Sequence, residues 1–259
     1  DATNTADQID VAAGFTKAFA GNVSTTDAAV NLAPSYSDTT KPTVTSFTSR
    51  TADGSYKSGA TINITANGSE AILGGSKMTA TLGTADQIEL TALQNGTTLV
   101  GTYTVSATDS STDLSVSSFT LTDASGNSTS VSDVYGNLLT STSMPANQNL
   151  SDNSAIVIDN IPIAAADSTP SASSADAGDS IALTFTEAVA NTSAISTAVA
   201  AATSTYGSSA STAWSNSNKT LTITLGSGEA VADGTALTIS SVQDAAGNES
   251  DITFTLDIA

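Results

Sequence analysis

Residues 121–137 read LTDASGNSTSVSDVYGN, the end of an apolar strand followed by two acidic turns. Each turn has the form Asp, two residues, Gly, Asn, and the two turns begin at Asp123 and Asp133. A close copy, VQDAAGNES, occupies residues 242–250. Because Asp123 and Asp244 lie 121 positions apart, the chain is predicted to contain two versions of one domain, both of which need this turn.

Two interpretations of the acidic turns stand side by side. Asp and Asn side chains bond back to nearby backbone, and Gly supplies a positive φ, so the pattern closes a loop without any metal. Alternatively, the carboxylate and amide oxygens bind Ca²⁺, which takes 6–8 oxygen ligands, more than one turn can offer. The predicted turn ligands are Asp123, Asn127, Asp133, Asn137, Asp244 and Asn248, and the candidate contributors from neighbouring loops or linkers are Asp38, Asp53, Asp159 and Asp167.

The charge balance limits the partners of the chain. Its 259 residues contain 25 Asp plus Glu against 6 Lys plus Arg, a formal charge of −19. Nucleic-acid binding needs a basic face, and an anionic membrane repels such a surface, so neither partner is expected. Bound divalent cations would relieve the self-repulsion of so many carboxylates.

Missing residue types exclude several kinds of chemistry. The chain has no Cys and no His, which rules out disulfides, thiolate or imidazole metal sites and a Ser-His-Asp triad. Paired carboxylates could hydrolyse glycosides, but nothing in the sequence marks the cleft that this reaction needs. No apolar run approaches the ~20 residues that span a bilayer. We therefore predict a protein that is not an enzyme and does not insert into a membrane.

The pattern along the chain predicts short strands separated by turns. Residues 1–40 are interpreted as a leader or the remnant of a preceding domain, with a possible short helix at 11–20, followed by domains at 41–160 and 161–259. The length is enough for two ordinary domains. The predicted strands are 44–47, 60–66, 78–82, 88–93, 98–105, 114–121 and 155–158 in the first domain, and 220–225, 236–242 and 252–258 in the second.

Several local features accompany these strands. The stretch GDSIALTFTEAV at 178–189 matches GATINIT at 59–65 followed by Glu70-Ala-Ile, which supports the internal repeat. Asn67-Gly68 predicts a tight turn. The Ala-rich stretch at 192–204 could form a helical turn. Trp214 is expected to pack in the core or against a loop and to begin a turn that ends at Lys219.

The second domain resembles the bacterial immunoglobulin-like domains of surface-layer proteins. The resemblance rests on the segments ALTFTEAV at 182–189, AWSNSNKTLTITLGSG at 213–228, ADGTALTIS at 232–240 and VQDAAGN at 242–248. The first domain is similar to tandem repeats of surface-layer proteins and large bacterial adhesins, through KPTVTSFTSRTADGSYKSGATINI at 41–64, NGTTLVGTYTV at 95–105 and NLSDNSAIVID at 149–159. The resemblance covers about 41–259 and implies an all-β chain of tandem immunoglobulin-like antiparallel β-sandwiches, located outside the cell on the bacterial surface.

The resemblance also implies candidate sites. Asp123 with Asn127 and Asp244 with Asn248 fall on the acidic turns of the family, and Glu70 and Glu187 fall on its strand carboxylate. For Glu187, simple exposure on the polar face of a strand is the alternative. Asp159 is the linker candidate beside the second domain, and the implied cofactor is Ca²⁺.

The predicted function is that of a structural surface protein, with Ca²⁺-stabilised modules of a self-assembling surface layer. The expected partners are further copies in a lattice or neighbouring domains of a longer chain, with a cell-surface glycan also possible. One alternative is the stalk or ligand-binding segment of an adhesin. Another is an accessory module of a secreted polysaccharide-degrading enzyme.

Overall fold

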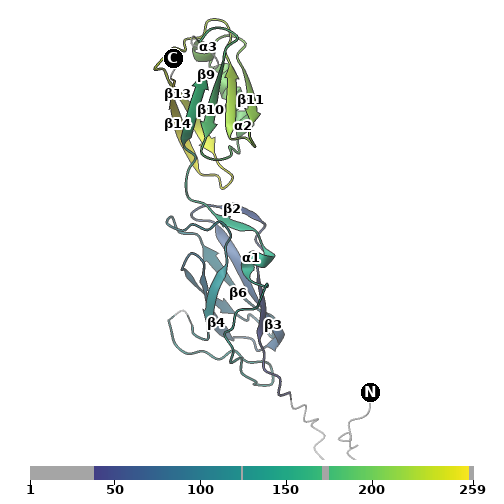
Figure 1. Ribbon diagram of the computed structural model, residues 1–259. Coiled ribbons are helices and arrows are strands. Elements are labelled where there is room, and N and C mark those ends of the chain that lie inside the picture. The colour runs from purple at the N-terminus through teal and green to yellow at the C-terminus, as the bar shows by residue number, and fades with distance from the viewer. Residues whose placement is uncertain (1–37, 124, 171–174, 257–259) are drawn as a thin grey trace, which may run out of the picture. The chain divides into compact units, whose positions relative to one another are not determined.

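A computed structural model describes residues 38–123, 125–170 and 175–256 (Figure 1). The predicted helix at 11–20 lies outside these residues. The chain divides into an N-terminal unit, Asp1–Thr40, and a larger unit, Lys41–Ala259. Within the larger unit, the buried apolar side chains form two separate clusters, one from Val44 to Ile158 and one from Ile163 to Leu256.

The first cluster lies against a six-stranded sheet of order β1-β3-β6-β5-β4-β7. Its strands are β1 (Val44–Thr48), β3 (Thr61–Ile72), β4 (Lys77–Leu82), β5 (Gln87–Thr91), β6 (Gly96–Thr104) and β7 (Val116–Thr120). All neighbours in this sheet are antiparallel. A short parallel pair, β2 (Gly54–Tyr56) with β8 (Ile156–Ile158), and the single-turn helix α1 (Leu150–Asn153) complete this part.

Alternation of apolar and polar residues forms the first core. In β3, Ile62 and Ile64 are fully buried, while Asn63 between them faces outward, as period-two alternation requires. The rings of Phe47 and Phe119 lie 5.7 Å apart at 60°, which places β1 and β7, the two edges of the sheet, on one core. The sheet is therefore apolar on one face and polar on the other.

The second cluster is enclosed by two antiparallel sheets (Figure 1). The larger has the order β11-β12-β10-β9 and the smaller pairs β13 with β14. The strands are β9 (Ala165–Pro170), β10 (Ser180–Phe185), β11 (Ser211–Ser215), β12 (Thr220–Thr224), β13 (Ala236–Gln243) and β14 (Glu249–Thr255). Helix α2 (Thr192–Ala201), followed by α3 (Thr203–Tyr206), packs against both β11 and β13 and closes one side of the sandwich.

Aromatic rings fill the second core. Phe185 stacks with Trp214 at 5.9 Å and meets the ring of Phe254 edge-on at 5.3 Å. The indole Nε1 of Trp214 donates to Ser196 Oγ on α2 at 3.1 Å, which satisfies its polar end. The predicted packing role of Trp214 is confirmed.

The fold class is confirmed as all-β with immunoglobulin-like sandwiches, and three local predictions need correction. Asn67-Gly68 does not form a tight turn, because β3 runs through it to Ile72 with a register shift against β6. Trp214 belongs to strand β11 rather than to a turn, because β11 pairs with β12. The pair β2 and β8 is parallel, whereas the predicted sandwich was antiparallel throughout.

Candidate metal sites

The three acidic turns share one hydrogen-bond pattern. In the turn that begins at Asp244, the backbone N–H and side-chain amide of Asn248 donate to the two carboxylate oxygens, at 2.8 and 2.7 Å. The turns at Asp133 and Asp123 are closed by the equivalent bonds from Asn137 and Asn127. The Gly of each turn has a φ between 80° and 92°, which an L side chain adopts at a cost. The local sequence alone is therefore sufficient to form these turns.

Burial separates the three turns into two kinds. Asp133 and Asp244 are each only 1% exposed, whereas Asp123 is partly exposed. A buried carboxylate needs charge partners or several hydrogen bonds, because removing a charge from water is costly. The surroundings of Asp133 and Asp244 therefore matter more than the turn itself.

Asp244 lies in a group of three carboxylates from three separate segments, which we call the Asp159 cluster. Asp159 follows β8, Glu187 follows β10, and Asp244 follows β13. One carboxylate oxygen from each lies within 4.8 Å of the other two. The carbonyl oxygen of Asp159 accepts a hydrogen bond at 3.0 Å from the side chain of Asn248, which also donates to Asp244. All of these groups are oxygen donors of the kind that Ca²⁺ prefers.

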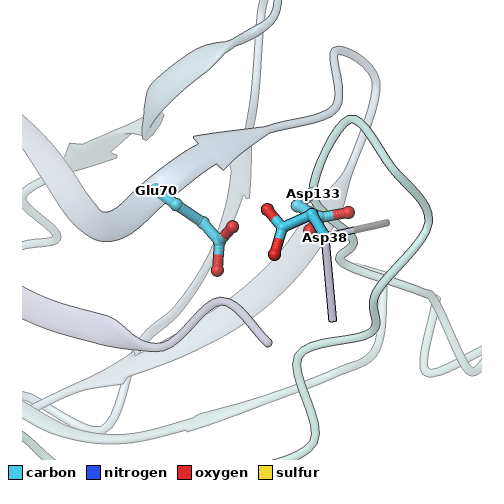
Figure 2. Close-up of side chains that lie close together, drawn as sticks. All are labelled: Asp38, Glu70 and Asp133. Carbon is cyan, nitrogen blue, oxygen red and sulfur yellow. The ribbon is translucent and has the colours of Figure 1, made fainter. Parts of the chain in front are cut away.

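Asp133 lies beside Glu70 in the same way, and we call these two residues the Asp133 pair. Glu70 comes from β3 and Asp133 from the acidic turn, and one carboxylate oxygen of each lies within 4.8 Å of the other (Figure 2). An isolated bridge between Ile72 and Asp133 brings the turn against the end of β3. Asp38, the third side chain in the figure, belongs to the N-terminal unit.

The two sites correct the way in which the repeats were paired. Asp123 was matched with Asp244 from the sequence, but the buried turn beside a strand Glu is the one that begins at Asp133. Hydrogen bonds from Asn127 lower the pKa of the Asp123 carboxyl, and the charge of Lys77 lowers it further. Cation binding by Asp123 and Asn127 stays a prediction that has no second carboxylate group in the described residues to support it.

The four acidic residues predicted to contribute from loops or linkers differ in their hydrogen-bond partners. Asp38 and Asp159 each accept a backbone hydrogen bond two residues ahead, from Thr40 at 2.8 Å and from Ile161 at 3.0 Å, so their local conformations are alike. Asp53 instead accepts from the backbone of Ala155. Asp167 lies in β9 and accepts from Ser168 and Thr169. Only Asp159 among these four contributes to a carboxylate group within the larger unit.

The charges in these sites perturb individual pKa values. Burial raises the pKa of Glu187, and the negative charges of Asp159 and Asp244 raise it further, while Lys219 opposes them. Burial would also raise the pKa of Asp133, but hydrogen bonds from Asn137, Tyr135 and Gly136 outweigh it and hold the pKa of Asp133 below its usual value. Asp133 therefore stays charged near neutral pH, whereas ionisation of Glu187 is disfavoured.

Without metal, Glu187→Gln is expected to raise the melting temperature by a few degrees at about pH 7. The folded-state pKa of Glu187 lies above its ordinary value of 4.5, so the protonated form is the more stable one in the folded protein. The stability that the protonated carboxyl contributes is fully present below pH 4.5 and is lost as the pH rises through the raised pKa. Thermal unfolding in EDTA, followed by fluorescence of Trp214, measures the difference between variant and wild type against pH.

Glu249→Gln serves as the matched control with the opposite sign. The side chain of Glu249 accepts from Gln243 Nε2 at 2.9 Å, and this bond lowers the pKa of Glu249. The Glu249 carboxylate therefore contributes stability above its ordinary pKa of 4.5, which is lost as the pH falls through the lowered value. If the advantage of Glu187→Gln persisted at low pH, packing rather than charge would be its cause.

Comparison with known proteins gives one family. Residues 159–256 match the model of a bacterial Ig-like domain. The match includes the whole second sandwich and all three carboxylates of the Asp159 cluster. No curated protein matches the chain. Within the described residues, no helix is long and apolar enough to cross a membrane.

Proposed function

We propose that the chain is a structural segment of a bacterial cell-surface protein whose immunoglobulin-like sandwiches are stabilised by Ca²⁺. The observation that carries the proposal is the Asp159 cluster, in which three carboxylates from separate segments meet and Asp244 is almost fully buried. Like charges at this separation repel one another strongly in a partly buried site. A divalent cation offsets this repulsion and uses all three side chains as ligands.

The donor chemistry fits Ca²⁺ better than other common metals. Zinc prefers nitrogen and sulfur ligands, and the chain has neither His nor Cys. The cluster offers only carboxylate and carbonyl oxygens, from residues Asp159, Glu187 and Asp244. Calcium accepts such hard ligands in flexible arrangements and fills remaining positions with water. The role proposed for the ion is structural: it stabilises the fold and takes part in no reaction.

The proposed effect is mechanical. A cation held by the Asp159 cluster ties the segment after β8 to the loops after β10 and β13, at one end of the second sandwich. Two further contacts support the same connection, from Asn248 to the carbonyl of Asp159 and from Lys57 Nζ to the carbonyl of Gly247. The Asp133 pair supports a related role in the first sandwich. Removal of the ion is then expected to loosen the segment after β8, which contains Asp159, before either hydrophobic core unfolds.

The family match and the charge support the proposed location and class. Bacterial Ig-like domains are generally non-catalytic modules of surface proteins, which supports an extracellular structural or accessory role. A formal charge of −19 keeps such a chain soluble and makes its contacts sensitive to divalent cations. We therefore propose that the chain is a structural module of a cell-surface protein.

Self-assembly in the presence of Ca²⁺ is the proposed purpose of the module. Large apolar side chains are exposed around the Asp133 turn, at Leu73, Val134, Tyr135 and Leu138. Exposed apolar patches of this kind often mark protein contacts. With the acidic loops neutralised by cations, copies of the chain can approach and bury these side chains.

Light scattering tests the assembly proposal. We expect the hydrodynamic size to grow when Ca²⁺ is added to metal-free protein, and to fall back when EDTA is added. Tyr135→Ser, which removes the most exposed of these four apolar side chains, should reduce the growth, while Mg²⁺ at the same concentration should not replace Ca²⁺. A monomer of unchanged size in Ca²⁺ would contradict assembly and favour the stalk of an adhesin.

A further inference from the structure

A groove lies on the first sandwich, away from the carboxylate groups. Its volume is about 500 Å³, and it opens on the polar face of the six-stranded sheet. Strands β3 and β6 form its floor, and the loops after β1 and β5 form its sides. The lining residues are Arg50, Asn63, Leu93, Gln94, Gly96, Thr98 and Val100.

Arg50 is fixed at the side of this groove by its neighbours. The hydroxyl of Ser49 donates to the carbonyl of Asn63 at 2.5 Å, and the backbone N–H of Asn63 donates to Thr51 Oγ1 at 2.8 Å. These two bonds hold the residues on both sides of Arg50 against β3. Within the described part of the chain, the guanidinium itself makes no hydrogen bond or ion pair. A guanidinium with all its donors available is an anion-binding group, and the bonds of Ser49 and Thr51 hold the backbone on both sides of it.

The identity of this residue is informative because the chain contains a single arginine and 25 acidic residues. Arginine binds planar carboxylates through two parallel N–H···O bonds, which lysine cannot do. One positive charge matches one carboxylate.

The rest of the lining is suited to hydroxyl groups. Asn63, Gln94 and Thr98 offer neutral donors and acceptors, and the side chain of Leu93 is 78% exposed at the rim. An apolar side chain beside amide and hydroxyl groups can contact the C–H face of a sugar ring while the polar groups bind its hydroxyls. The groove thus combines a carboxylate-binding group with a surface for a polyhydroxylated ring.

A peptide strand cannot bind here through its backbone. Strand β3 is paired with β1 on one side and β6 on the other, and β6 is paired with β3 and β5. Addition of a strand needs unpaired backbone N–H and C=O groups, and at Asn63 both are already used, the N–H by Thr51 Oγ1 and the C=O by the hydroxyl of Ser49. Recognition must therefore use side chains, as in saccharide binding.

We propose that this groove binds an acidic saccharide, with the uronic-acid carboxylate on the guanidinium of Arg50 and the sugar hydroxyls on Asn63, Gln94 and Thr98. The site goes beyond the structural role proposed above and is independent of the carboxylate groups. It gives the module a way to hold a carboxylated polysaccharide at the cell surface.

Titration by NMR and calorimetry tests the site. The probes are tetragalacturonate, a tetrasaccharide of hyaluronan and an alginate trimer, each beside the same oligosaccharide with its carboxylates reduced to alcohols. We expect saturable binding of at least one acidic probe, with shift changes at Asn63, Thr98 and Val100. Reduction of the carboxylates and the variant Arg50→Gln should each weaken binding about tenfold or more, the effect of one lost charge-assisted contact.

Lys41→Gln is the matched control, because it removes the same charge from an exposed side chain that does not line the groove. This variant should bind as the wild type does. Absence of saturable binding to all three acidic probes would overturn the proposal. So would binding that Arg50→Gln leaves unchanged, or shift changes confined to other surfaces. A carboxylated peptide that bound this groove while every saccharide failed would overturn it too.

Discussion

Addition of Ca²⁺ should raise the melting temperature of the second sandwich by about 10 °C or more at a free concentration about a hundred times the dissociation constant. Binding to the folded state alone contributes about 2.7 kcal/mol at that concentration. For a domain of about 100 residues, 1 kcal/mol corresponds to roughly 4–8 °C. Differential scanning calorimetry in Ca²⁺ and in EDTA measures the shift.

The shift should depend on the Asp159 cluster. Asp159→Asn and Glu187→Gln keep the size of each side chain and remove one negative charge, so each should abolish most of the Ca²⁺ effect. Asp113→Asn is the matched control, because Asp113 is exposed and lies outside both carboxylate groups. Equal shifts in all three variants would mean that Ca²⁺ acts elsewhere. No shift in the wild type would contradict the proposed metal site.

Asp133→Ala should lower the melting temperature of the first sandwich in EDTA by about 10 °C, far more than Asp123→Ala, for which we expect about 2 °C or less. The two residues accept equivalent hydrogen bonds, from Tyr135 and Asn137 in one turn and from Ser125 and Asn127 in the other. They differ in burial, since Asp133 is 1% exposed and Asp123 is partly exposed.

The two variants are expected to differ because the hydrogen-bond donors to the removed carboxylate are left in different surroundings. When Asp133 is removed, its part-buried hydrogen bonds lose their acceptor and water replaces it less readily than at Asp123, whose hydrogen bonds are exposed. Calorimetry in EDTA separates this effect from metal binding, and repetition in Ca²⁺ adds the contribution of the ion. Equal losses in the two variants would show that the turn itself, rather than its burial, determines stability.

The strands were predictable where alternation is strong. In β12 every second residue is apolar and buried, and this strand was predicted from the alternation of its sequence. The tight turn at Asn67-Gly68 failed because β3 pairs with β1 and β6 at once, and the side chain of Asn67 bonds to Ser46 and Thr48 on β1. Pairing on both sides outweighs the local turn preference of two residues.

The candidate site was predictable in part for the same reason. Each acidic turn depends on contacts within five residues, so the sequence pattern was enough to place all three. Which turn becomes buried beside a glutamate depends on partners far away in the chain. The bridge between Ile72 and Asp133 decides this in the first sandwich, and no local signal separates Asp133 from Asp123.

The sequence by itself therefore determined the all-β class, the acidic turns and the kinds of chemistry that are excluded, because these depend on composition and on short-range backbone preferences. The tertiary structure alone decided that Asp159, Glu187 and Asp244 meet, and that Arg50 lies at a polar groove with its guanidinium available. Both arrangements join segments that are distant in the chain. Their proximity follows from strand pairing and core packing, which act between residues that no local pattern connects.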